Sequence, residues 1–142
     1  MTAAVNAPIF PSGLASAAVV VADSDTTAKK TLYTDAGNGS IIRGGIGAVS
    51  IDTVSRDFYL WMNIGGTDYL KGTITVPAGA GNTGAVVGVN MFNRANIPDL
   101  SLDTNGNMYL KVPPSGIVKI SAAATLSSTK NCTFVAADID TF

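Results

Sequence analysis

The side chains that most often carry out catalysis or bind metal ions are scarce in this chain. Among its 142 residues there is no histidine, there is one cysteine, and all ten acidic residues are aspartates. Imidazole is the usual proton carrier near neutral pH, so most acid–base and nucleophilic mechanisms lack their central group here. The aspartates are dispersed, and no spacing marks two of them as the carboxylate pair of a glycosidase. We therefore predict a protein that is not an enzyme and has no catalytic residues.

The segment Asp103–Asn107 carries carboxylate and amide oxygens at alternate positions, as the start of a calcium-binding loop does. However, Gly106 comes earlier than such a loop requires, and Pro114 stands where the closing glutamate would be. The segment therefore predicts a turn between strands, and we expect no metal site.

The glycine-rich segment Gly79–Gly84 fits the pattern of a dinucleotide-binding loop. That pattern needs a helix to begin at the glycines, so that the helix N-terminus meets the pyrophosphate. The residues that follow, Ala85–Val89, are β-branched in part and contain a further glycine, which disfavours a helix. We expect a flexible loop here and no bound cofactor.

The single cysteine, Cys132, begins the apolar-flanked run Cys132–Val135. It has no partner for an intramolecular disulfide, and a reactive thiol needs a histidine or a cation beside it. We predict a small buried thiol without a chemical role.

The composition favours association with other protein. Charged residues make up only 13% of the chain and hydrophobic residues 46%, whereas soluble domains average about 25% charged residues. Charge normally keeps protein surfaces apart, so a surface this poor in charge invites contact. The net charge is −1, and Lys29–Lys30 is the only adjacent basic pair. Without a basic stripe to neutralise phosphates, we expect no nucleic-acid partner.

The N-terminal part of the chain is apolar but does not match a targeting signal. Leu14–Ala22 resembles the core of a secretory signal peptide, yet no Lys or Arg precedes it, and Pro8 and Pro11 interrupt the approach. It is also shorter than the roughly 20 residues of a membrane-spanning helix, so we expect no membrane association. We interpret residues 1–26 as an extended arm, which either adds to a neighbouring subunit or closes the chain's own fold. The candidate contact residues of this arm are Ile9, Phe10 and Leu14.

The rest of the chain, residues 27–142, has the pattern of a single all-β domain. Short segments rich in β-branched and aromatic residues alternate with turn signals at about 8- to 12-residue intervals, as in sandwiches and barrels. No segment of helical length shows an apolar period of 3.6 residues. The glycines within Ile41–Ile51 predict a bent or bulged strand. The other expected strands are Lys30–Thr34, Phe58–Ile64, Tyr69–Val76, Ala85–Phe92, Leu100–Leu102, Met108–Val112, Gly116–Ala123 and Thr133–Ala137.

The segment Gly65–Asp68 predicts a hairpin between two of these strands. If its loop holds an even number of residues, Tyr59 and Trp61 share a face with the apolar residues of the second strand, and we expect that face to form the core. The opposite face is then apolar as well. Either the chain's own arm or a second sheet covers it, or it contacts another subunit. The candidate contact residues on this opposite face are Phe58, Leu60 and Met62.

Three groups of segments carry a wider resemblance. They are Lys30–Thr34 with Asn38–Ser40, Thr67–Leu70 with Val76–Gly84, and Ile97–Leu100 with Asp103–Leu110. Over about residues 29–125 the pattern resembles the small decoration, or cement, proteins of tailed-bacteriophage capsids. The resemblance consists of strands and turns and includes no chemical motif.

The resemblance implies an antiparallel, jelly-roll-like β-sandwich on the outer capsid surface of a virion. There the chain would bind the major capsid protein, bridge neighbouring capsid subunits and stabilise the shell. A homo-oligomer, either a dimer or a trimer, is also implied.

The alternative function is a carbohydrate- or receptor-binding β-sandwich module of a virion or cell surface. Such a module needs exposed aromatic rings as its binding platform, and the hairpin pattern counts against Trp61, which it assigns to the core. The aromatic candidates are Tyr59, Trp61, Tyr69 and Tyr109.

Overall fold

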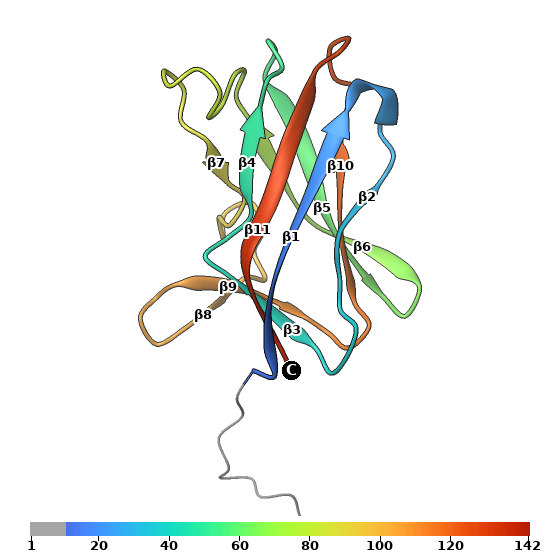
Figure 1. The fold of residues 1–142 in the computed structure, drawn as a ribbon, viewed down its shortest axis with the longest axis vertical. Coiled ribbons are helices and arrows are strands. Elements are labelled where there is room, and N and C mark those ends of the chain that lie inside the picture. The colour runs from blue at the N-terminus through green and yellow to red at the C-terminus, as the bar shows by residue number, and fades with distance from the viewer. Residues whose placement is uncertain (1–10) are drawn as a thin grey trace, which may run out of the picture.

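The chain folds into two packed β-sheets. The computed structural model describes residues 11–142 (Figure 1). Within this range the only helical element is the 3₁₀ turn η1 (Asp23–Asp25), and no helix is long and apolar enough to cross a membrane. The strands are β1 (Gly13–Ala22), β2 (Lys30–Thr34), β3 (Ser40–Arg43), β4 (Gly47–Ser50), β5 (Arg56–Ile64), β6 (Thr67–Val76), β7 (Val89–Asn90), β8 (Ser101–Leu102), β9 (Met108–Val112), β10 (Ile117–Ala122) and β11 (Asn131–Thr141).

The two sheets differ in size, and all of their strand pairs are antiparallel. Sheet B has four strands in the order β2-β10-β5-β6. Sheet A has seven strands and is organised around the long strand β11, which pairs with β1 along one side. On its other side β11 pairs first with β4 and then with β3; β4 continues to β7, and β3 continues to β9 and β8. The predicted all-β sandwich is thus confirmed (Figure 1).

The core lies between the sheets because each strand turns alternate side chains inward. Phe134 from β11 meets Phe58 from β5 edge to face, with their ring centroids 4.9 Å apart, and both side chains are fully buried. Such an aromatic pair stabilises by about 0.5–1.5 kcal/mol beyond the area that it buries. The neighbouring strands β1, β3 and β10 contribute the fully buried Val21, Ile42 and Ile120.

The glycine-rich segment that we expected to bend is broken into β3 and β4. The break falls at Gly44 and Gly45, whose φ angles of 72° and 107° lie in the region that favours glycine. A Cβ atom at Gly45 would also lie 2.0 Å from the side chain of Asn90. The break allows one continuous segment to pair with both halves of β11.

Most of the other strand predictions are confirmed, with one exception. Of the expected strand Ala85–Phe92, only β7 forms. The preceding loop turns back on itself, with the Gly81 N–H donating to the Val86 carbonyl at 2.7 Å, so most of this segment cannot pair with a sheet. As predicted, Gly79–Gly84 is a loop and Asp103–Asn107 is a turn.

The predicted facing of the β5–β6 hairpin is wrong. Its turn contains two residues, so Ile64 pairs with Thr67, and the register then shifts opposite Leu60 and Trp61. The shift leaves Lys71 as an extra residue in β6, and one extra residue inverts the facing of one strand relative to the other.

The inversion places Phe58, Leu60 and Met62 in the core, where they are 0%, 0% and 1% exposed. Sheet A covers them, so the alternative that a second sheet covers these three residues is confirmed, and the alternative that they contact another subunit is wrong. Trp61 lies instead on the outer face of sheet B. There its Nε1 donates to the Ser121 hydroxyl at 2.8 Å.

The N-terminal segment closes the chain's own sandwich, which was one of the two roles left open for it. Residues 13–22 form β1, which pairs with β11 and buries Val21 completely. The sandwich therefore begins before residue 27, the boundary that the sequence indicated. Ile9 and Phe10 lie outside the described residues.

Two buried aspartates tie loops together at the ends of the sandwich. The Asp52 carboxylate accepts hydrogen bonds from the backbone and side chain of Ser127 and from Arg56. Burial favours a higher pKa for Asp52, but these bonds outweigh burial and hold its pKa well below the usual range. Asp35 is likewise buried, with a lowered pKa, and accepts hydrogen bonds from Gly37, Gly39, Ser40 and Ser115.

Cys132 is buried, as predicted. Burial raises the pKa of its thiol to about 12, with a further contribution from the charge of Asp52. The thiol therefore stays protonated at neutral pH, which suits a packing role.

Candidate functional site

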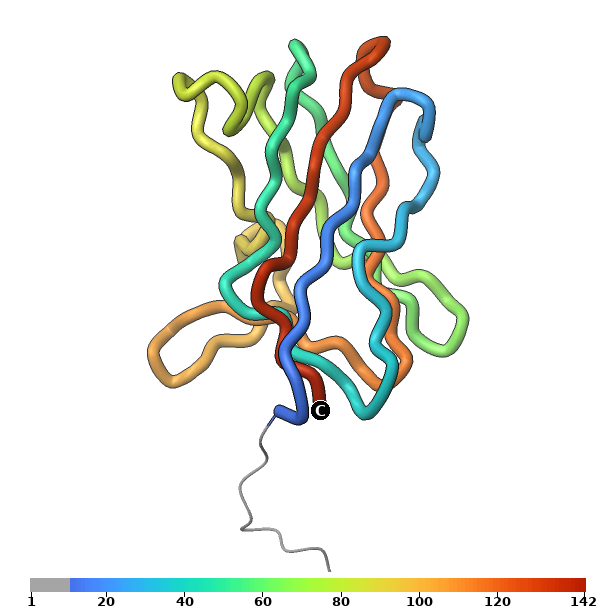
Figure 2. Tube along the Cα trace, viewed as in Figure 1, coloured from blue at the N-terminus to red at the C-terminus, as the bar shows by residue number. Residues whose placement is uncertain are grey.

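The outer face of sheet A is divided by charge. We define the uncharged half as the outer face of β1, β4 and residues 131–137 of β11, and the charged half as the outer face of β3, β8, β9 and residues 138–141. None of the residues in the strands of the uncharged half is Asp, Lys or Arg. Figure 2 shows β1 (blue), β11 (red) and β4 (teal) running side by side, with the β8–β9 hairpin (orange) projecting below them.

The uncharged half exposes small and apolar side chains. Val20, Val49 and Val135 are 45%, 43% and 40% exposed, although valine is usually a core residue. They lie close together because Val20 and Val49 both pair with Thr133 from opposite sides, while Val135 follows two residues along β11. The result is a surface without charge whose exposed side chains are small or apolar.

The uncharged half ends at the edge strand β1. Among the described residues, β1 pairs only with β11, lies close to β2 of sheet B, and contains neither proline nor a charged residue. Proteins usually protect such edges with Lys, Pro or a bulge that prevents pairing with another chain. Here the one such feature is a bulge opposite Ser16, so most of the ten-residue strand retains main-chain groups that a partner strand can pair with.

A β-bulge separates the two halves. The register between β1 and β11 shifts so that Ala137 and Asp138 stand opposite the single residue Ser16. Both residues of the bulge are exposed, as expected where an extra residue disrupts the alternation of a strand. Charge on this face begins at Asp138.

The charged half is organised around Arg43. Arg43 pairs across the sheet with Asp138 on β11 and with Tyr109 on β9, so the three residues form one row over adjacent strands. Its Nε donates to the Asp140 carboxylate at 2.5 Å, and its guanidinium lies 5.8 Å from the centroid of the Tyr109 ring. The hydrogen bond with Asp140 is the main reason why the pKa of Arg43 is raised, and the charges of Asp103 and Asp138 add to it.

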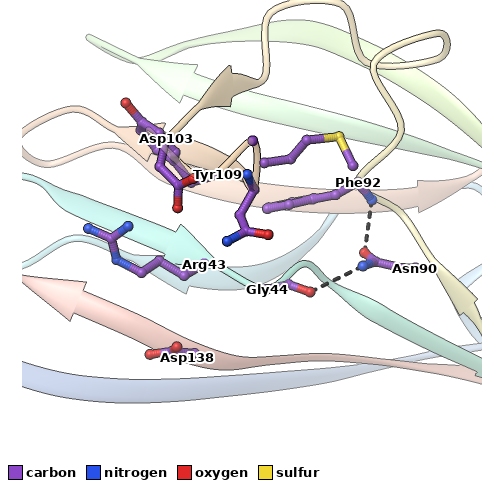
Figure 3. Close-up of a pocket in the computed structure, with 10 residues that line it drawn as sticks. Arg43, Gly44, Asn90, Phe92, Asp103, Tyr109 and Asp138 are labelled. Carbon is purple, nitrogen blue, oxygen red and sulfur yellow. Dashed lines mark hydrogen bonds between the residues drawn. The ribbon is translucent and has the colours of Figure 1, made fainter.

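A pocket of about 430 Å³ opens beside this row (Figure 3). Its walls come from the turn between β8 and β9 on one side and from the break between β3 and β4 with β7 on the other. The residues that line it are Arg43, Gly44, Asn90, Phe92, Asp103, Gly106, Asn107, Met108, Tyr109 and Asp138.

Local hydrogen bonds fix both walls of the pocket. On one wall, Oδ1 of Asp103 accepts the backbone N–H groups of Asn105 and Asn107, each at 2.9 Å. The N–H of Asn107 is the main cause of the lowered pKa of Asp103, so this carboxylate is ionised near neutral pH. On the other wall, the amide of Asn90 donates to the Gly44 carbonyl at 3.1 Å.

The predicted site residues fall into three groups. Leu14 is 80% exposed on β1, opposite Asp140, and so remains available for contact. Phe58 and its neighbours are in the core, and Ile9 and Phe10 are outside the described range. The three exposed valines and the Arg43 row were not predicted from the sequence, because both depend on pairing between distant segments. One signal was visible: the uncharged stretch Leu14–Ala22.

Of the aromatic candidates, Tyr109 lines the pocket, and Tyr69 is 53% exposed on β6 in the other sheet. The Lys29 ammonium lies 3.9 Å from the centroid of the Trp61 ring and so covers one face of the indole. Tyr109 is therefore better placed for a ligand than Trp61.

Within residues 11–142, no group of three or more His, Cys, Asp or Glu side chains is placed to hold a metal ion. Comparisons with protein-family models, with curated proteins and with solved structures give no match.

Proposed function

We propose that this chain is a virion structural protein that binds the outer surface of an assembled tailed-phage capsid. In this role it bridges neighbouring major capsid subunits as a homo-oligomer and stabilises the shell. The observation that carries the proposal is the uncharged half of sheet A, an exposed apolar sheet face that adjoins the edge strand β1. The strand-and-turn resemblance to decoration proteins gives the kind of partner.

The uncharged half has the physical properties of a surface that is covered in an assembly. Removing apolar surface from water is favourable by about 25 cal/mol per Å², and no charge on these strands has to be desolvated first. The free edge of β1 can add main-chain hydrogen bonds to a partner strand. Together, the face and the edge offer both burial and directional bonds.

A repeating shell makes weak contacts of this kind sufficient. An oligomer that binds several capsid subunits gains affinity because its later contacts form within one complex. Binding to assembled subunits, and not to separated ones, stabilises the shell by mass action. The mechanism therefore needs no catalytic residue.

The proposal is tested by sedimenting the chain with phage particles and counting the bound copies per particle. Saturable, stoichiometric occupancy in many copies is expected, and shells stripped of the chain should melt at a lower temperature. Only a few bound copies would contradict the capsid role, and unchanged melting of stripped shells would contradict the stabilising role.

A pair of substitutions tests which surface is used. The double variant Val20→Lys, Val135→Lys places two charges on the uncharged half, and binding should weaken at least about 100-fold because the contact would bury unpaired charge. The matched control is Val54→Lys, because Val54 is 48% exposed but lies in the loop after β4. Full occupancy by the double variant would show that the uncharged half is not the contact.

A further inference from the structure

We propose that the pocket in the charged half binds a neutral sugar ring. This goes beyond the proposed capsid role, because the site lies on the other half of sheet A and can be studied on the isolated chain. The row of residues in its lining, the charges around it and the hydrogen bonds that hold its walls support this assignment.

Three of the lining residues form a row with the extent of a small ring-shaped ligand. Tyr109, Arg43 and Asp138 lie side by side on three adjacent strands, and directly opposed side chains are about 5 Å apart at Cβ. The row is therefore about 10 Å long and presents an aromatic ring, a guanidinium and a carboxylate in turn. The cavity of about 430 Å³ is within the range of about 300–1,000 Å³ that is common for small-molecule sites.

The charges around the pocket disfavour an anion. It would meet Asp103 and Asp138, while the single cation, Arg43, is already paired with Asp140. A cation is attracted to these carboxylates, but it can only donate hydrogen bonds and offers no acceptor to the guanidinium of Arg43, which lies between them (Figure 3). A ligand without net charge that carries hydroxyl groups avoids the repulsion and can serve both kinds of group.

The polar groups require a ligand that both donates and accepts hydrogen bonds. Within residues 11–142, the Nη groups of Arg43 have no hydrogen-bond partner, and Asp138 accepts none through its side chain. A guanidinium only donates, and a carboxylate only accepts. Neighbouring sugar hydroxyls can accept from Arg43 and donate to Asp138 at the same time, and bonds to charged groups are the stronger kind. The side-chain amide of Asn107 can do either.

Tyr109 supplies the apolar contact that distinguishes a sugar from a freely soluble small polyol. Its ring lies in the same row, half-buried, and can pack against the C–H face of a pyranose. The hydrogen bonds of Asp103 and Asn90 hold the walls before any ligand arrives. Binding therefore requires little ordering of the protein, which preserves affinity.

The test is a titration of the ¹⁵N-labelled chain, followed by two-dimensional NMR. The probes are free glucose, galactose, mannose and N-acetylglucosamine, with glucuronate and N-acetyl-lysine amide as charged comparisons. At least one neutral sugar should shift the amides of Gly44, Asn107 and Tyr109 with saturation. A Kd on the order of 1 mM is expected for a ligand of this size. Both charged probes should bind at least tenfold more weakly.

Three variants test the assignment of residues. Tyr109→Ala removes the ring, and Asp138→Asn removes the carboxylate from an exposed position where the fold does not depend on it; each should weaken sugar binding at least tenfold. Val54→Ala is the control, because Val54 is 48% exposed in the loop after β4 and does not line the pocket, and it should bind as the unmodified chain does.

The outcomes separate this inference from the capsid role. No saturable shift with any neutral sugar, tighter binding of a charged probe in the pocket, or equal binding by Asp138→Asn would each overturn the sugar site. None of these results bears on sedimentation with particles, and loss of particle binding would leave the sugar titration unchanged.

Discussion

The two halves of sheet A share one face but expose different kinds of side chain to water. In the charged half, charged groups are partly paired with one another, as when Arg43 is held by Asp140 and lies near Tyr109. In the uncharged half, apolar side chains such as Val20 and Val135 are exposed and no part of residues 11–142 covers them. A single sheet therefore carries a polar surface with a pocket and, beyond one bulge, an exposed apolar surface.

The largest expected effect contrasts the inner and outer sides of the uncharged half. Phe134 and Val135 are neighbours on β11, the first fully buried and the second 40% exposed. Phe134→Ala should lower the free energy of unfolding by about 3–5 kcal/mol, because it leaves a cavity beside Phe58. Val135→Ala should lower it by less than about 0.5 kcal/mol. Urea denaturation of both variants measures the difference.

A large loss of stability in Val135→Ala would break the comparison. It would mean that the outer side of the uncharged half contributes to folding, and its apolar character would then need no partner to explain it. If Phe134→Ala loses far more free energy of unfolding than Val135→Ala, the comparison is sharpened, because the outer valines then contribute little to the stability of the fold.

The sequence predicts features that depend on residues close together along the chain better than features that depend on residues far apart along it. Strands such as Lys30–Thr34 and Met108–Val112 were predicted with the bounds that the structure has, because propensity and flanking turns are local. The side of the sheet to which Phe58 points was not predicted correctly. The extra residue Lys71 in β6 reverses the facing of one strand, and no local sequence pattern indicates such a bulge.

The candidate sites were harder to predict than the strands. The pocket joins Arg43, Tyr109 and Asp138 from three strands that are far apart in the sequence. The uncharged half likewise exists only because β1 pairs with β11, the two ends of the domain. Lack of charge in Leu14–Ala22 was visible, but whether that segment would be an outer arm or an edge strand was a matter of tertiary pairing.

An intermediate effect is expected in the charged half. Arg43→Ala removes the partner of Asp140, whose residue is only 8% exposed. Because Arg43 itself is partly in solvent, we expect a loss of about 1–2 kcal/mol in the free energy of unfolding, between that of a buried and an exposed ion pair. Urea denaturation at neutral pH measures it, and the value should exceed that of Val135→Ala.

The double variant Arg43→Ala, Asp140→Asn provides the control for this pair. If the cost of the single variant comes from the uncompensated carboxylate, the second substitution should restore part of the lost stability. Strictly additive losses would contradict the view that Arg43 compensates the charge of Asp140.

The smallest expected effect is confined to the turn that walls the pocket. The pKa of Asp103 is lowered chiefly by the backbone N–H of Asn107, while partial burial opposes this and the N–H of Asn105 reinforces it. A lowered folded-state pKa means that the carboxylate supports the turn fully above its ordinary value of 3.8. That support is lost as the pH falls through the lower, folded-state value. In an NMR titration, the amide protons of Asn105 and Asn107 should therefore shift with a midpoint below 3.8, and Asp103→Asn should abolish the shift.

The same titration distinguishes the two halves, because the strands of the uncharged half carry no carboxylate whose protonation would shift their amide protons. The amide protons of Val20 and Val135 should stay unchanged over the range in which the turn responds. A midpoint at or above the ordinary value would contradict the assigned role of Asp103. Simultaneous shifts at Val20 and Val135 would show that acid acts on the whole sandwich through buried groups such as Asp52, and that the two halves of the face are not independent in their response to charge.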